Sequence, residues 1–248
     1  MNHCEIFERS REERVKKMLA ARLGLRDYVL ENARQGDIQN IIDTIDQFGW
    51  TQQWLMNIGD RKGQILDQAI RTRQPKTVLE LGKNSSVDVS IIYISFLALG
   101  TFLGYSSLRM IDQLPKDALL ITIESDCQSA EIARAIHQYA GVSDRIDIVN
   151  DSTENVIPHL SETFNIDSFD LIFIDHGKDF YLRDFKLLEN AGLIRSGTTI
   201  VADNVIIPGA PEYIEYVRNN PNYITRCYEE YFEYDNELVD GIEVSIRI

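Results

Sequence analysis

The sequence predicts an α/β fold built on a mostly parallel β-sheet, and three observations support this prediction. Short apolar runs typical of strands alternate with longer helical stretches over most of the chain. Alternating units of this kind form parallel sheets with right-handed crossovers. Two of the runs end directly in polar side chains, and open α/β sheets bind their ligands beyond the carboxyl ends of their strands. The last two candidate strands follow one another without a helix between them.

The part of the chain before Thr77 predicts helices. Asp37 is a suitable N-cap for the second of them. Apolar side chains recur there at helical spacing in three stripes. The stripes are Val15, Met18, Leu19 and Leu23, then Ile38, Ile41, Ile42 and Ile45, then Ile65, Leu66, Ala69 and Ile70.

The rest of the chain predicts strands separated by helices. The strand candidates are Thr77–Leu81, Leu119–Ile123, Ile146–Val149, Leu171–Ile174 and Thr198–Ala202, followed by the pair Tyr223–Tyr234 and Gly241–Ile248. Helical stretches include Ser129–Tyr139 and Tyr181–Asn190. Because repeats, linkers and low-complexity tracts are absent from the sequence, we expect residues 1–248 to form one domain, with residues 1–24 as a helical extension.

Composition argues against several classes of function. A net charge of −14 and a pI near 4.7 disfavour nucleic acid as a partner, because its phosphates would be repelled. The stretch Val89–Leu108 carries no charge, but its second half is rich in glycine and serine, so we expect no membrane span. The amino terminus lacks the apolar core of a signal peptide, and three widely spaced cysteines do not suggest a disulfide framework. We therefore expect a cytoplasmic protein.

Two neighbouring motifs indicate a metal site. The run Leu171–Ile174 leads into Asp175, and the run that ends at Ala202 leads into Asp203 and Asn204. If these strands are adjacent, three oxygen donors surround one point, and such a set suits Mg²⁺. Lys178 would lie beside that cation, whose charge favours the neutral amine and so a general base.

The first two predicted strands indicate where a nucleoside could bind. The first ends in Glu80-Leu81-Gly82 and the second in Glu124, a position that often holds ribose hydroxyls. The dinucleotide glycine pattern and a Walker lysine are both absent, so a nucleoside without a pyrophosphate fits better. Each signal alone has an ordinary explanation, because strand-end carboxylates commonly cap helices and single lysines are usually solvated.

A series of short blocks carries a resemblance to a known family. In order, they are Trp54–Asp60, Leu79–Gly82, Gly104–Ser106, Ile121–Glu124, Ala140–Val142, Asp175–Lys178, Ala202–Val205, Pro208–Pro211, Phe232–Tyr234 and Val239–Gly241. With these blocks, the chain from about Leu25 onward resembles the Mg²⁺-dependent catechol O-methyltransferases of animals. The resemblance implies a Rossmann-like S-adenosylmethionine methyltransferase fold, whose seven-stranded, mostly parallel sheet has an antiparallel last strand and helices on both faces.

The resemblance also implies a role for each matching residue. It assigns Mg²⁺ to Asp175, Asp203 and Asn204, deprotonation of one catechol hydroxyl to Lys178, and a hydrogen bond from the other hydroxyl to Glu233. The catechol would lie among Trp54, Pro208, Phe232, Lys178, Asn204 and Glu233. The implied S-adenosylmethionine contacts are Met56, Asn57, Ile58, Glu80, Gly82, Phe102, Tyr105, Ser106, Glu124, Ser125, Thr153, Glu154, Asp175 and His176. The expected partner is a small catechol, and the expected state a monomer or weak homodimer.

The sequence departs from the family pattern in four places. Gly177 replaces a tryptophan, Glu154 a glutamine and Phe102 a tyrosine. In addition, residues 83–100 separate Gly82 from the rest of the cofactor loop, and deleting these 18 residues restores the family motif. We interpret them as an atypical insertion, such as a retained intron, that is absent from the functional protein. The alternative is a genuine insertion in a non-catalytic or impaired paralogue.

Overall fold

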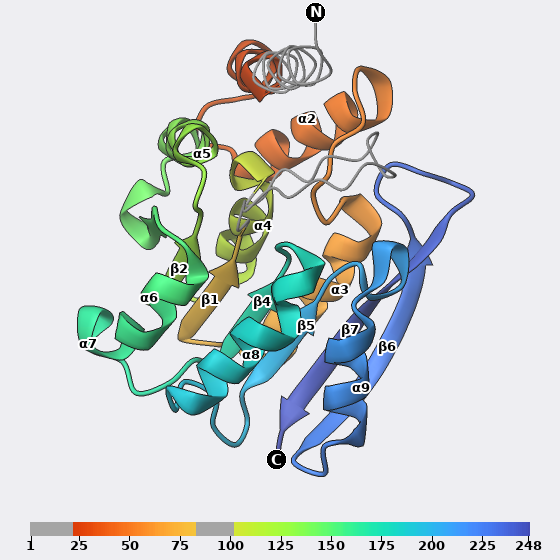
Figure 1. Cartoon of the computed structure of the whole chain (residues 1–248). Coiled ribbons are helices and arrows are strands. Elements are labelled where there is room, and N and C mark those ends of the chain that lie inside the picture. The colour runs from red at the N-terminus through yellow and green to blue at the C-terminus, as the bar shows by residue number, and fades with distance from the viewer. Residues whose placement is uncertain (1–21, 83–101) are drawn as a thin grey trace, which may run out of the picture.

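The computed structural model describes residues 22–82 and 102–248. In this part of the chain, seven strands form one sheet in the order β3-β2-β1-β4-β5-β7-β6 (Figure 1). Strands β1 to β5 pair with one another in parallel, and β7 is antiparallel to both β5 and β6. The predicted mostly parallel sheet with an antiparallel strand is thus confirmed. The strands are β1 Thr77–Leu81, β2 Leu119–Ile123, β3 Ile146–Val149, β4 Leu171–Ile174, β5 Thr199–Ala202, β6 Tyr223–Tyr231 and β7 Val239–Arg247.

The helices form where the apolar stripes and caps predict them. Asp37 caps α2 by accepting a hydrogen bond from the backbone N–H of Asn40 at 3.0 Å, and Asp126 caps α5 in the same way. Residues 22–32 are also helical. The other helices are α2 Ile38–Thr51, α3 Asp60–Arg73, α4 Tyr105–Gln113, α5 Cys127–Ala140, α6 Thr153–Val156, α7 Leu160–Phe164, α8 Tyr181–Asn190 and α9 Pro211–Asn219.

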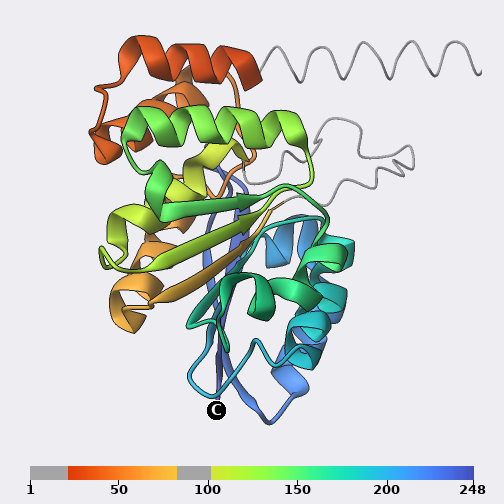
Figure 2. The same ribbon diagram turned by 90° about the vertical axis from the view of Figure 1, so that its left-hand side faces the viewer.

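Helices cover both faces of the sheet, and a separate hydrophobic cluster fills each interface (Figure 2). Helices α2 to α5 lie over one face, where their apolar residues pack against alternate sheet positions such as Val78 and Leu120. Helices α8 and α9 lie over the other face, against Leu79 and Ile121. Because successive strand residues point to opposite faces, each parallel strand contributes to both clusters. Buried on both faces, the central strand β4 reads as a continuous apolar run, Leu171–Ile174.

Some predictions lie outside the described residues. These are the first helical stripe up to Leu19, most of the extension at residues 1–24, and the insertion at residues 83–100. Most of the uncharged stretch Val89–Leu108 lies there too. In residues 22–82 and 102–248, no helix combines the length and apolar character that crossing a bilayer requires.

Candidate active site

The residues that follow four strands lie in one row at the carboxyl edge of the sheet. The register pairs Leu81 of β1 with both Ile123 of β2 and Ile174 of β4, and Ile174 with Ala202 of β5. The row beyond these positions therefore contains Gly82, Glu124, Asp175 and Asp203. Strand β1 lies between β2 and β4, so the order of strands along the chain runs outward from β1 in both directions. Open α/β sheets bind ligands at such a switch point.

The ammonium of Lys178 contacts the side chains of two predicted metal ligands, Asp175 and Asn204, and the backbone of the third, Asp203. Its Nζ is 3.2 Å from Asp175 Oδ1, 3.0 Å from Asn204 Oδ1 and 3.4 Å from the backbone oxygen of Asp203. It also donates to the hydroxyl of the buried Tyr181 at 2.5 Å. The structure thus brings Asp175, Lys178, Asp203 and Asn204 to one point. Asn204 reaches it from a left-handed backbone conformation, with φ of 52°, where the chain turns out of β5.

A second, fully buried lysine lies on the other side of this point. Lys62 of α3 places its Nζ 2.8 Å from Asp203 Oδ1, 3.1 Å from Glu233 Oε1 and 2.7 Å from Asp240 Oδ2. Burial alone would lower the pKa of Lys62, but the three carboxylates reverse this and raise it. Lys62 is therefore a permanent cation among the acidic side chains.

The acidic side chains of this cluster are affected by burial to different degrees. Burial raises the pKa of Asp203 well above its usual range, although Lys62 opposes the shift and the neighbouring carboxylates add to it. Burial likewise raises the pKa of Glu233. Burial would also raise the pKa of Asp240, but the Lys62 charge and hydrogen bonds outweigh it and leave that pKa below the usual range. The cluster thus contains more carboxyl groups than lysines, and burial favours the protonated form of Asp203 and Glu233.

The carboxyl ends of β1 and β2 form the other half of the site. Glu80 is buried and accepts a hydrogen bond from the hydroxyl of Ser106, the second residue of α4. Glu124 is fully buried at the end of β2, and its Oε1 accepts from the backbone N–H of Asp126 at 2.8 Å. Buried contacts also join the end of β4 to helices α6 and α8. His176 Nε2 lies 2.9 Å from Asp184 Oδ2, which also accepts from the hydroxyl of Thr153 at 2.5 Å.

Two aromatic rings border the acidic cluster. Trp54 and Phe232 are stacked, with ring centroids 5.8 Å apart and an interplanar angle of 11°. The indole N–H of Trp54 donates to the backbone oxygen of Glu233 at 2.8 Å. Pro208 lies at the exposed end of the cis Ile207-Pro208 turn after β5.

Comparison with known proteins decides the family. A family model described as O-methyltransferase matches residues 89–226. The chain is also 40% identical over 249 residues to catechol O-methyltransferase B of Danio rerio, an alignment that covers 98% of this chain and 84% of that protein. The chain belongs to the O-methyltransferase family. The catalysed reaction is therefore transfer of a methyl group to an oxygen.

Other similar proteins agree with this assignment. Catechol O-methyltransferase of Bos taurus is 38% identical, over 87% of this chain and 72% of that protein. Among solved structures, an O-methyltransferase from Bacillus cereus matches with a TM-score of 0.60 and 20% identity, covering 75% of this chain and 80% of that one. The O-methyltransferase TomG from Streptomyces achromogenes matches with a TM-score of 0.61 and 23% identity, covering 75% and 79%. The two structures support the fold.

The predicted cofactor residues divide by position in this O-methyltransferase. Gly82, Glu124, Ser125, Asp175 and His176 follow the strand ends directly. Met56 and Asn57 lie in the loop before α3, and Asn57 is held by a hydrogen bond from Tyr234. In contrast, Ile58 is buried in the hydrophobic cluster beneath α2 to α5, Tyr105 donates its hydroxyl to Asp46, and Glu154 is exposed beside Arg183. Phe102 begins the turn before α4.

Two charged residues at this site were missed by the sequence interpretation, namely Lys62 and Asp240. Lys62 lies four positions before Leu66, so it falls on the apolar stripe of α3 rather than on its polar face. Asp240 lies two positions before the buried Ile242 of β7, so it faces the same side of the strand. A charge at a core position of a helix or strand was the available signal.

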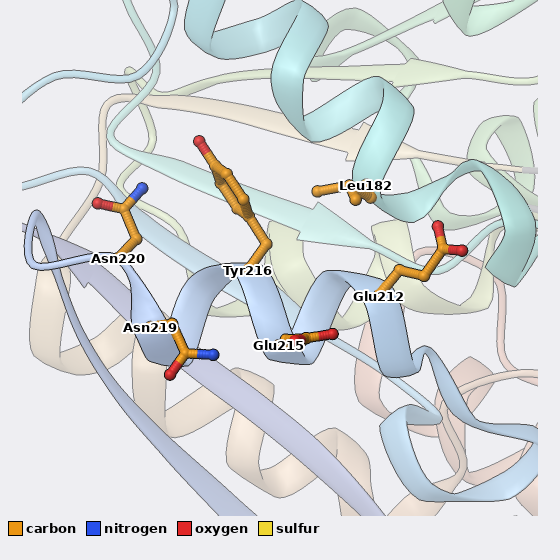
Figure 3. Close-up of a pocket in the computed structure, with 6 residues that line it drawn as sticks. All are labelled: Leu182, Glu212, Glu215, Tyr216, Asn219 and Asn220. Carbon is orange, nitrogen blue, oxygen red and sulfur yellow. The ribbon is translucent and has the colours of Figure 1, made fainter.

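A separate cavity lies between α8 and α9. Its volume is about 530 Å³, and its lining residues are Leu182, Glu212, Glu215, Tyr216, Asn219 and Asn220 (Figure 3). The hydroxyl of Tyr216 donates to Glu189 at 2.7 Å. None of these lining residues is among those predicted to bind cofactor, metal or substrate.

The buried Glu80 predicts a measurable pH dependence of stability. Burial raises its pKa from 4.5 to about 7. Between these values the folded protein binds more protons than the unfolded chain, so the contribution of Glu80 to stability falls as pH rises. A shift of this size corresponds to about 3 kcal/mol. We therefore expect Glu80→Gln to gain stability relative to wild type between about pH 5 and pH 8, measured by urea unfolding. A difference that stays constant with pH would contradict this expectation.

Proposed function

We propose that this O-methyltransferase transfers the methyl group of S-adenosylmethionine to one hydroxyl of a catechol, and that it requires Mg²⁺. The observation that carries the proposal is that Lys178 contacts the side chains of Asp175 and Asn204 and the backbone oxygen of Asp203, whose carboxylate is buried beside Lys62. The names of the curated relatives point to the same substrate class.

The side chains present suit a divalent cation. Asp203 Oδ2 is buried and forms no hydrogen bond within the described residues. In the part of the chain that the structure describes, four carboxylates, those of Asp175, Asp203, Glu233 and Asp240, form their ion pairs with two ammonium groups, those of Lys62 and Lys178. In the described residues, no three His, Cys, Asp or Glu side chains form a metal site of their own, and three of these carboxylates instead contact Lys62. Two carboxylates and an amide oxygen are ligands that Mg²⁺ accepts.

The chain's own residues then position and deprotonate the substrate. Asp175, Asp203 and Asn204 would hold Mg²⁺, which when bound acidifies and orients the two catechol oxygens. Lys178, which contacts Asp175 and Asn204, would take the proton from the hydroxyl that attacks the methyl group. Glu233 Oε2 is buried without a hydrogen bond in the described structure, so it can accept one from the other hydroxyl. Trp54 and Phe232 would pack against the ring.

The carboxylates at the ends of β1 and β2 would bind the cofactor. Glu124 is suited to accept hydrogen bonds from the ribose hydroxyls, because it is buried at the end of the second strand. Glu80 and Ser106 lie beside it at the end of β1. These carboxylates and the contacts of Lys178 lie along the same edge of the sheet, so one site could hold cofactor and catechol together. Holding the two reactants in this way can lower the barrier by about 7–11 kcal/mol.

A comparison of catechol with phenol tests the substrate class. We expect kcat/KM to be roughly 10- to 150-fold higher for a catechol than for a phenol with one hydroxyl, because Glu233 loses a hydrogen bond to the phenol. Glu233→Gln should reduce this ratio, whereas the control Glu230→Gln, three positions earlier at the end of β6, should preserve it. Equal rates for both substrates in wild type would contradict the proposal.

A non-catalytic paralogue is the second candidate, because residues 83–100 interrupt the cofactor motif between Gly82 and Thr101. Affinity for S-adenosylmethionine separates the two, measured by calorimetry on the full chain and on a variant that lacks residues 83–100. Tight binding by both supports the enzyme with a tolerated insertion. Binding by the shortened variant alone supports the interrupted site.

A further inference from the structure

The side-chain amide of Asn204 has only one orientation that satisfies its neighbours. Its Nδ2 donates to Glu233 Oε1 at 2.8 Å and to Asp240 Oδ2 at 2.9 Å, while its Oδ1 accepts from Lys178 Nζ at 3.0 Å. The reversed amide would place its N–H groups against the Lys178 ammonium and its oxygen against two carboxylates. The neighbours of Asn204 therefore decide which atom it presents to the proposed metal position.

Asp240 is the neighbour that is itself most firmly held. Its Oδ2 accepts from Lys62 Nζ at 2.7 Å, in addition to Asn204 Nδ2. Its Oδ1 accepts from the backbone N–H groups of Ile206 and Ile207 at 3.2 and 2.8 Å. The side chain is fully buried. It thus joins α3, β7 and the turn that follows Asn204 through four donors.

We infer that Asp240 is a positioning residue that fixes the amide of Asn204 so that its oxygen, not its nitrogen, faces the metal. This inference rests on the proposed Mg²⁺ site and adds a residue that lies outside the ligand set. Partners of this kind, which orient a metal ligand without contacting the metal, commonly change metal affinity when they are replaced.

The role at position 240 requires a side chain with two oxygens that both accept hydrogen bonds. An asparagine there would have one oxygen and one N–H₂ group for the same four donors. If the N–H₂ group faced Lys62 and Asn204, two donor–donor contacts would result. If it faced Ile206 and Ile207, their backbone N–H groups would lose their acceptor in the turn. In either orientation the support for the Asn204 amide is weakened.

The test is metal binding rather than catalysis. Binding of Mn²⁺ is followed by electron paramagnetic resonance in the absence of substrate, with Mg²⁺ as competitor. We expect Asp240→Asn to weaken the affinity for Mn²⁺ about 10- to 100-fold. The control is Glu243→Gln on the same strand, which breaks the ion pair of this buried carboxylate with the half-exposed Arg218 and should leave metal affinity unchanged. Thermal unfolding of both variants shows whether their stability losses are comparable.

A double-substitution cycle separates a positioning role from a general loss of structure. If Asp240 acts through Asn204, adding Asp240→Asn to Asn204→Ala should cause little further loss of affinity. Should Asp240→Asn fail to fold, Asp240→Glu, which displaces the carboxylate by one methylene, is expected to weaken binding in the same direction. Wild-type affinity in the folded variant, or full additivity in the cycle, overturns the inference. Absence of Mn²⁺ binding by wild type instead overturns the proposed metal site.

Discussion

Replacing Lys178 by methionine is expected to lower kcat for methyl transfer about 10²- to 10⁴-fold, because the general base is lost. Lys178 Nζ lies within 3.4 Å of groups from all three proposed metal ligands, so it is adjacent to any oxygen bound there. The affinity for S-adenosylmethionine should remain close to that of wild type, because the predicted cofactor residues do not include Lys178. Quenched-flow measurement of a single turnover isolates the chemical step from product release.

A lysine on the same stretch of chain provides the control. Lys186 lies on α8, where its ammonium is 5.0 Å from the centre of the Tyr216 ring. Lys186→Met removes the same charge from the protein and should leave the single-turnover rate unchanged. Wild-type kcat in Lys178→Met would show that the base has been assigned to the wrong residue.

The second large effect concerns stability rather than rate. Lys62→Met is expected to lower the free energy of unfolding by about 3–5 kcal/mol at neutral pH, because it leaves Asp203, Glu233 and Asp240 buried without their common cation. Urea unfolding in the presence of a chelator measures this loss. The loss should increase as pH rises, since the uncompensated carboxyl groups bind protons more tightly in the folded protein than in the unfolded chain.

An exposed ion pair supplies the comparison for Lys62. Lys76 lies 3.3 Å from Asp117, and both side chains are about 70% exposed, at 72% and 69%. Solvent screens such pairs, so Lys76→Met should change stability little. If Lys62→Met were as mild as Lys76→Met, the buried cluster would not depend on the lysine for its charge balance.

The strands could be predicted from sequence because the physics that forms them is local. A strand buried on both faces is mostly apolar, and the runs predicted at Thr77–Leu81 and Leu171–Ile174 coincide with β1 and β4, although β1 also contains the buried Glu80. The row of strand ends then follows from parallel pairing alone, which is why Asp175, Asp203 and Asn204 lie close together at one edge of the sheet. Helix α4 was not predicted because Gly104, Ser106 and Ser107 favour turns, and packing against α2 and α3 overrides that preference.

Lys62 and Asp240 could not be assigned a role from sequence, because their importance depends on contacts between distant segments. A lysine in a helix and an aspartate in a strand are usually solvated. Here α3, β5 and β7 bring Lys62, Asp203 and Asp240 into one buried cluster, although 178 positions separate the lysine from Asp240. Motif spacing predicts the groups that would touch the ligand. It does not predict the residues that hold those groups in place.

The most direct test of the central claim is the metal dependence of methyl transfer to a catechol. Purified protein is incubated with labelled S-adenosylmethionine and a simple catechol in Mg²⁺, then in a chelator, and then with Mg²⁺ restored in excess. We expect a labelled monomethyl ether to form with Mg²⁺, to stop forming in the chelator, and to form again when the ion returns. An unchanged rate in the chelator would contradict the assignment of Asp175, Asp203 and Asn204 to a catalytic Mg²⁺.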